Sequence, residues 1–247
     1  MQLRASWDLS FAAGAFLGDG SFVEDSDYHH HVKLAVRDYD FAKAFNDSVA
    51  IILRRRPNVV LVTSNKGKTF YESKYSCRSL GLFLERPLKQ LLPDVSNYPA
   101  GFLRGLFSAD GSAGVWVWNK RLEIRAELGN SDLELLTAVG SILHTSFQIN
   151  SNIYLARRKG ASWKNGYKTV ILRKDAYQLR IQRLQDVRRF AKVIGFQIQR
   201  KQDRLERALR LVDRLGGVKA ASRWRSLRLG RQAPEKLTSL NDLSAVN

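Results

Sequence analysis

Two short segments of the 247-residue chain end on the same three residues, and each carries an acidic side chain where a helix is expected to stop. Asp19 is followed by Gly20 and a serine, and Asp110, 91 residues further along, is followed by Gly111 and a serine. A carboxylate in the last turn of a helix is disfavoured, because the negative end of the helix dipole lies there. We expect Gly111 to end its helix in a left-handed conformation. An unfavourable feature that occurs twice indicates a function for both aspartates.

The residues before each aspartate predict two helices with nearly bare faces. Residues 11–21 read FAAGAFLGDGS and residues 102–112 read FLRGLFSADGS. Gly14 and Gly105 occupy matching positions, although glycine inside a helix costs about 1 kcal/mol relative to alanine. Bare faces allow two helices to pack in parallel, which would bring both aspartates together. Adjacent carboxylates repel unless one is protonated or a cation lies between them, and hard oxygen ligands with room for water favour Mg²⁺.

The nine-residue segments 12–20 (AAGAFLGDG) and 103–111 (LRGLFSADG) resemble the motif of the LAGLIDADG homing endonucleases, specifically the monomeric two-motif type. The resemblance implies an α+β fold of two pseudo-symmetric αββαββα repeats that pack through parallel LAGLIDADG helices. Their antiparallel sheets would form a DNA-binding saddle. We place the N-terminal repeat at residues 1–97, the C-terminal repeat at 98–215, and a basic C-terminal extension at 216–247.

The resemblance also implies a metal-dependent endonuclease. Such an enzyme hydrolyses one phosphodiester on each strand of a long pseudo-palindromic DNA site and leaves short 3′ overhangs. Asp19 and Asp110 would each serve one strand, and the backbone carbonyls of Gly18 and Ala109 would help them to bind metal. Paired carboxylates can hold ions that activate water and stabilise the departing oxygen. The expected ion is Mg²⁺, with Mn²⁺ as a substitute.

Further catalytic candidates follow from positions that are polar or basic in the family. A polar residue follows the second strand of each repeat, where our alignment places Asp38 and Asn130 as equivalents. Near the end of the second repeat, Lys201 or Gln199 would order water or neutralise the scissile phosphate. Lys201 could equally be a surface lysine on a basic helix. In the first repeat the corresponding spacing reaches Asn97, which is not basic.

The charge of the chain points to a polyanionic partner. The sequence has 41 Lys and Arg against 23 Asp and Glu, a formal net charge of +18, which is more than solubility requires. We find no segment with 18 uninterrupted apolar residues and no signal peptide, so we expect a soluble intracellular protein with no membrane partner. The only cysteine, Cys77, excludes an internal disulfide and a cysteine-based zinc site.

Alternating residues predict strands with one face towards the core and one towards a partner. Val32, Leu34 and Val36 alternate with Lys33 and Arg37. Glutamate and glutamine among arginines permit base reading as well as phosphate contact. The alternative is that these are ordinary solvated strand faces. The predicted strand positions that contact DNA are Lys33, Arg37, Lys74, Glu123, Arg125, Glu127, Gln178, Arg180 and Gln182.

An insertion distinguishes the second half from the first. Residues 157–168, RRKGASWKNGYK, are basic and predict a long hairpin or loop that contacts a DNA backbone through Arg157, Arg158 and Lys168.

Two local features are also expected: Asp8 should cap the first motif helix, and Pro87 should kink or break the helix predicted over 79–92.

The sequence leaves a second class of function open. The same scaffold could serve as an RNA maturase that binds intron RNA, or as a DNA-binding regulator that does not cleave. The two intact aspartates favour the enzyme, because a protein that only binds has no need of carboxylates at disfavoured helix ends. The expected partner is double-stranded DNA with a long specific site, bound by a monomer.

Overall fold

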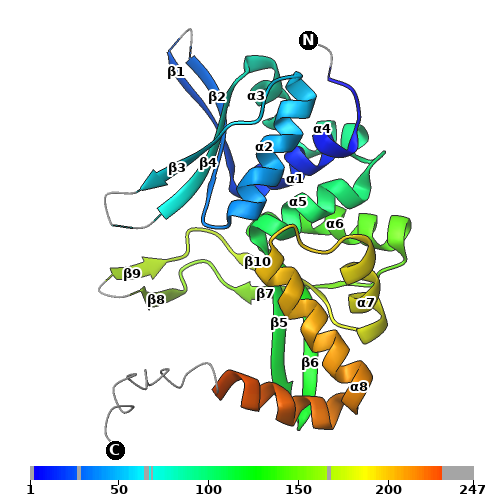
Figure 1. Ribbon diagram of the computed structural model, residues 1–247. Helices are drawn as coiled ribbons and strands as arrows, with labels where there is room; N and C mark the ends of the chain where they lie inside the picture. The colour runs from blue at the N-terminus through cyan, green and yellow to red at the C-terminus, as the bar shows by residue number, and fades with distance from the viewer. Residues whose placement is uncertain (1–2, 27–28, 64–66, 68, 166–167, 230–247) are drawn as a thin grey trace, which may run out of the picture.

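The N-terminal half of the computed structural model is a four-stranded antiparallel sheet with helices against one face (Figure 1). The structure describes residues 3–26, 29–63, 67, 69–165 and 168–229. The strand order is β1-β2-β4-β3. The elements of this half are α1 (Trp7–Asp19), β1 (Gly20–Ser26), β2 (His29–Val36), α2 (Tyr39–Leu53), β3 (Val59–Thr63), β4 (Thr69–Ser76), α3 (Arg78–Leu84) and α4 (Leu88–Val95).

The C-terminal half repeats this order. Its sheet runs β5-β6-β10-β7, which is the same arrangement of first, second, fourth and third strand. The predicted α+β fold of two pseudo-symmetric repeats is confirmed. The elements are α5 (Pro99–Asp110), β5 (Gly111–Trp118), β6 (Arg121–Asn130), α6 (Leu133–Phe147), β7 (Asn152–Arg157), β8 (Ser162–Asn165), β9 (Lys168–Ile171), β10 (Ala176–Ile181), α7 (Leu184–Val193) and α8 (Gln199–Leu229).

The core forms where the sheets meet their helices. The inward residues of β2 are Val32, Leu34 and Val36, as the alternation predicts, and all three are buried. The corresponding face of β6 is buried as well. Residues 9–16 of α1 are all buried, which explains why this segment has almost no polar side chains. Among the described residues no helix is both long and apolar enough to cross a membrane.

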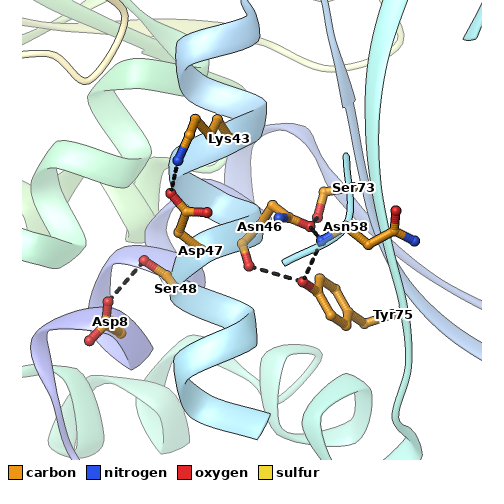
Figure 2. A network of polar contacts seen from close by, with 8 residues as sticks. All are labelled: Asp8, Lys43, Asn46, Asp47, Ser48, Asn58, Ser73 and Tyr75. Atoms are coloured by element: carbon orange, nitrogen blue, oxygen red, sulfur yellow. Dashed lines mark hydrogen bonds and ion pairs between the residues drawn. The ribbon is translucent and has the colours of Figure 1, made fainter. Parts of the chain in front are cut away.

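A buried polar network fixes α2 against β4 in the first half (Figure 2). Asn46 Oδ1 accepts hydrogen bonds from Asn58 N (3.0 Å) and from Ser73 Oγ (3.2 Å). The Tyr75 hydroxyl donates to Asn46 O (3.2 Å). Buried polar groups are costly unless they are paired, so this satisfied network specifies how the helix sits on the sheet.

Several local predictions need correction at the helix ends. Ser6, not Asp8, caps α1: its Oγ accepts from Leu9 N at 3.1 Å, while Asp8 Oδ1 accepts from Ser48 Oγ. Gly20 and Gly111 do not adopt a left-handed conformation. Their φ angles are −83° and −88° with extended ψ, because each motif helix passes directly into a strand.

The strand register corrects the alignment of the two halves. Gly20 pairs with Leu34 in the first half, whereas Gly111 pairs with Leu128 in the second. The second hairpin is therefore three residues longer between these partners (17 residues against 14). Asn130 corresponds to Val36 by this register, and Asp38 corresponds to Asp132, the residue that caps α6.

The insertion and the proline behave as the sequence predicts. Most of the hairpin β8–β9 comes from this insertion, and Trp163 of β8 pairs with Val170 of β9. In Figure 1 this hairpin projects away from the helices. Pro87 separates α3 from α4, so the helix predicted over 79–92 is two short helices.

The close packing of the motif helices makes a stability prediction with an internal control. A Cβ added at Gly105 would lie 2.3 Å from Phe11 O and 2.6 Å from Ala15 N. Gly105→Ala should therefore lower the free energy of unfolding by about 3 kcal/mol or more, since backbone must move apart. Gly140 in α6 has only ordinary contacts, the nearest at 3.5 Å, so Gly140→Ala should be neutral or stabilising by up to about 1 kcal/mol. Urea denaturation of both variants measures the difference, and equal effects would contradict the packing.

Candidate functional site

The site begins with two helices in backbone contact. A Cβ on Gly14 would lie 2.0 Å from Phe102 O, so only glycine permits this approach of α1 to α5. At the C-terminal ends, a Cβ on Gly18 would lie 2.3 Å from the Cβ of Ala109 and 3.5 Å from Asp110 Cγ. The helices therefore end side by side. Asp19, the next residue after Gly18, lies close enough to Asp110 to interact with it electrostatically.

The environment of the two carboxyls disfavours their charge. Burial, and then the nearby Asp19, raise the pKa of Asp110 to about 6. A hydrogen bond from Asn130 Nδ2 to Asp110 Oδ2 (3.0 Å) and the charge of Lys201 oppose this shift only in part. Partial burial also raises the pKa of Asp19. Two carboxyls in this state gain stability from any cation placed between them.

Lys201 lies beside the ends of both motif helices. Its Nζ donates to Ser108 O (2.6 Å) and Ala109 O (3.2 Å), which are last-turn carbonyls of α5 without helical partners. Burial lowers the pKa of Lys201 to about 8, although Asp19 and Asp110 act in the opposite direction. Of the two candidates in this segment, the structure thus brings Lys201 to the aspartates.

Gln199 faces a different way. Its Nε2 donates to Asp203 Oδ1 (2.7 Å) on the same helix, α8. Its backbone N–H donates to Asp40 Oδ2, at the beginning of α2 in the first repeat. Gln199 therefore helps to attach α8 to the first repeat, and its side chain is exposed.

Asp38 binds Arg200, a residue that the sequence analysis does not select. Arg200 Nε and Nη2 donate to the two carboxylate oxygens at 2.6 and 2.7 Å. These hydrogen bonds lower the pKa of Asp38. Arg200 stands next to Lys201, but no sequence pattern indicates that the beginning of α8 reaches back to the first repeat. This contact supplies a basic residue where the first repeat has only Asn97.

The donor set fits a hard divalent cation. Mg²⁺ in proteins commonly takes one or two carboxylates and completes its shell with water and substrate phosphate oxygens. Asp19 and Asp110 offer those carboxylates. Burial is the main cause of the raised pKa of each, and the nearby Asp19 adds to the shift of Asp110. Among the described residues there is no cluster of three His, Cys, Asp or Glu side chains that could hold a metal ion. Ala109 O already accepts a hydrogen bond from Lys201.

The outward face of the second sheet carries a connected set of charged and aromatic groups. Glu127 Oε1 lies 3.5 Å from Arg180 Nε and 4.0 Å from Arg125 Nη1. Arg125 lies over the Trp116 ring at 4.4 Å, and Arg180 lies over the Tyr154 ring at 4.7 Å. The side chain of Glu127 is only 12% exposed, so it orients both guanidinium groups.

The remaining predicted contacts of this repeat lie around that set. Gln178 Oε1 accepts from Arg180 Nε (3.0 Å) and Nη2 (2.7 Å). Gln182 Nε2 donates to the Tyr154 hydroxyl (3.2 Å). Glu123 is half-buried opposite Trp116 in the strand register. Arg157 ends β7, Arg158 follows it and is exposed, and Lys168 begins β9.

The first sheet has a simpler outward face. Lys33 Nζ pairs with Glu72 Oε2 at 2.5 Å, and Lys74, opposite Lys33 in the register, is exposed. Arg37 lies over the Phe70 ring at 5.8 Å. The two halves therefore present different side chains on equivalent strands.

Family models match each half of the chain separately. The model of a LAGLIDADG-like domain matches residues 97–195. The model of the WhiA LAGLIDADG-like domain matches residues 9–71. Each match contains one motif helix and its aspartate. Each half of the chain is therefore similar to a LAGLIDADG-like domain.

One relative and several solved structures are also similar to this chain. The uncharacterized protein MJ0398 of Methanocaldococcus jannaschii is 27% identical to this chain over 215 residues, covering 87% of the chain and 76% of the relative. The structure of I-DmoI in complex with DNA and Ca has a TM-score of 0.55 at 17% identity, covering 83% of the chain and 99% of I-DmoI. The structure of I-DmoI in complex with DNA and Mn has a TM-score of 0.52 at 17% identity. That match covers 78% of this chain and 98% of I-DmoI. I-DmoI is a homing endonuclease, and at these identities the match establishes the fold.

The raised pKa of Asp110 predicts how stability changes with pH. Because the folded pKa of about 6 exceeds the ordinary value of 3.8, ionisation costs stability above pH 6, and this cost disappears as pH falls to 3.8. In metal-free buffer, Asp110→Asn should raise the free energy of unfolding by about 1–2 kcal/mol at pH 7.5 and much less at pH 4. Asp203→Asn, on the exposed face of α8, is the control. An equal effect of Asp110→Asn at both pH values would contradict the assigned electrostatics.

The pair of Asp38 and Arg200 should couple the two repeats. A double-mutant cycle with Asp38→Ala and Arg200→Ala should give a coupling energy of about 1 kcal/mol, because the pair is bidentate but partly exposed. Arg200→Lys should lose most of it, since an ammonium cannot make the parallel bonds. The pair of Arg210 and Glu206 within α8 should couple by only about 0.3–0.5 kcal/mol. Urea titration measures both, and a smaller value for the first pair would refute the coupling.

Proposed function

We propose that this chain is a site-specific double-strand DNA endonuclease of the homing type. It hydrolyses one phosphodiester on each strand of a long pseudo-palindromic target and leaves short 3′ overhangs. It acts as a monomer, because one chain carries both motifs. The substrate chemistry requires a divalent cation, Mg²⁺ or Mn²⁺, at Asp19 and Asp110.

The juxtaposition of the two aspartates is the observation that carries the proposal. Both lie in the last turn of a helix, where an anion is disfavoured. Partial burial and their mutual repulsion add to that cost for Asp110. A folded protein retains such an arrangement where a cation and its substrate use it, and neither helix packing nor turn formation requires the carboxylates.

The side chains divide the work of phosphodiester hydrolysis. Bound Mg²⁺ supplies activation of water and stabilisation of the departing oxygen. Asp19 and Asp110 hold that charge at the junction of the repeats, one for each strand. Asn130 Nδ2 donates a hydrogen bond to Asp110 Oδ2 and so orients the carboxyl. Lys201, anchored on the α5 carbonyls, places an ammonium near both aspartates, where it can neutralise a scissile phosphate or orient water.

Recognition of the target follows from the two sheets. A strand ribbon fits the major groove, and its outward side chains reach base edges. Arg125 and Arg180 are held by Glu127 and by aromatic rings, so their free edges have a fixed direction. Arginine with fixed geometry is suited to the two acceptors of guanine. The similarity in fold to I-DmoI, which is solved in complex with DNA, supports this use of the sheets.

The decisive experiment uses a plasmid that carries the uninterrupted insertion junction of the gene. With Mg²⁺ the protein should produce linear DNA. Asp19→Asn and Asp110→Asn should each lower the rate of linear product by at least about a hundredfold, because each removes a carboxylate that holds the ion. Asp94→Asn, in α4 beside the other end of α1, removes an aspartate that pairs with Arg86 and should cut as the unaltered protein does. Gel electrophoresis over time measures all four proteins.

A second candidate is a protein that binds nucleic acid on this scaffold without cutting it. The observation that favours it is the match of the first repeat to the WhiA LAGLIDADG-like domain. Tight, specific duplex binding with no cleavage in Mg²⁺ or Mn²⁺ would establish this candidate and reject the nuclease. Improved splicing of a host intron would instead indicate an RNA maturase, with intron RNA as partner.

A further inference from the structure

The long helix α8 changes direction at Gly216 and packs its last part against the end of the second sheet. Gly216 has a φ of 70° and a ψ of 162°, a conformation that favours glycine. Beyond it, α8 runs across the lower end of the β5–β6 hairpin (Figure 1, red). Gly217 lies against the side chain of Arg121, at the start of β6. The bend therefore carries the chain around the hairpin.

Apolar side chains anchor this last part of α8. Ala220 and Ala221 are buried, and so is Trp224. Arg204, earlier on α8, lies over the Trp224 ring at 5.9 Å and also donates to Val115 O on β5 (3.2 Å). The segment is thus attached to the second repeat as a fixed part of its surface.

All the charged side chains exposed on this segment are cationic. Lys219, Arg223 and Arg225 are exposed, and the sequence has no acidic residue from 214 to 234. The neighbouring hairpin adds exposed Lys120 and Arg121. None of these five cations has an acidic partner within 4.0 Å among the described residues. We call these five residues the end surface.

The end surface differs from the sheet faces in what it can recognise. On the sheets, Lys33, Arg125 and Arg180 are paired with glutamates, which fixes their direction and lowers the net charge. The unpaired cations of the end surface provide charge without fixed direction. Such groups contact phosphates, which position a duplex but carry no sequence information.

The place of the end surface defines which DNA it can reach. β5 runs eight residues from Gly111, beside the aspartates, to Trp118 at the hairpin turn, or about 26 Å. Duplex DNA rises about 3.4 Å per base pair, so the hairpin turn corresponds to about eight base pairs from the centre of the site. Trp118 is 64% exposed there, on the same strand face as Trp116. In Figure 1 the last part of α8 runs towards the side from which the β8–β9 hairpin projects.

We propose that the end surface, Lys120, Arg121, Lys219, Arg223 and Arg225, binds the phosphate backbone of duplex DNA that flanks the target beyond the C-terminal half-site. This inference rests on the proposed DNA binding. The contact is independent of sequence and is present on one side only, because among the described residues the N-terminal repeat has no counterpart of the segment after Gly216. The DNA footprint is therefore asymmetric.

The first test measures the salt dependence of binding to a 40-base-pair duplex of random sequence by fluorescence anisotropy. The variant Lys219→Gln, Arg223→Gln, Arg225→Gln should bind about tenfold more weakly at moderate salt. Its log–log salt slope should fall by about 2–3 units, since each phosphate contact contributes about 0.9. The control Lys43→Gln, Lys89→Gln, Lys192→Gln removes the same charge from the helices α2, α4 and α7 and should change the slope by less than about 0.5. Equal slopes for the two variants would overturn the proposal.

The second test locates the contact. Duplexes that carry the gene's uninterrupted insertion junction are shortened on one side or the other to about eight base pairs from the centre. Shortening beyond the C-terminal half-site should weaken binding of the unaltered protein about tenfold and leave the triple variant unchanged. Shortening on the other side should not distinguish the two proteins. Equal sensitivity on both sides, or a larger loss of affinity for single-stranded RNA than for duplex, would overturn the assignment to flanking DNA.

These measurements distinguish a failure of the proposed function from a failure of the end surface alone. If the unaltered protein binds no duplex at any salt concentration, the proposed function and this inference both fall. If it binds and the triple variant matches the control, only the end surface is refuted. Circular dichroism of the triple variant checks folding, which glutamine at three exposed helical positions should preserve.

Discussion

The approach of α1 to α5 is the constraint on which the rest of this structure depends. Gly14 and Gly105 leave no room for a side chain between the helices, so backbone meets backbone. Because the helices are parallel and end together, their last residues cannot separate. The same packing that joins the two repeats thus fixes Asp19 and Asp110 as neighbours. The packing energy of the surrounding buried side chains offsets their repulsion. The negative potential between the two carboxylates favours the binding of a cation.

The repeats are less independent than their symmetry suggests. The beginning of α8 belongs to the second repeat, yet Arg200 binds Asp38 in the first. The next residue, Lys201, lies beside both motif helices. The first turn of α8 therefore contacts both halves. The two aspartates also have different neighbours, because Asn130 contacts Asp110 and Asp38 lies near Asp19. Two related carboxyls in unlike surroundings give the pseudo-symmetric fold an asymmetric centre.

Charge in this protein is organised in two ways that suit different tasks. On the second sheet Glu127 holds two arginines against aromatic rings, which limits their freedom before any partner arrives. Along the end of that sheet the cations of the end surface have no such partners. Preorganised guanidinium groups favour discrimination, whereas unpaired cations favour affinity and salt dependence. The large positive charge of the chain therefore has separable local roles.

The sequence by itself determined the repeat, the motif helices, the buried strand faces and the two aspartates, because each depends on local periodicity or on a pattern that occurs twice. It could not determine the register of the hairpins, so Asp38 was aligned with Asn130 although the longer β5–β6 hairpin makes Asp132 its counterpart. It also could not select Arg200, since the contact with Asp38 spans 162 residues. Only tertiary structure decides such contacts, because they depend on where a helix from one repeat ends in space relative to the other.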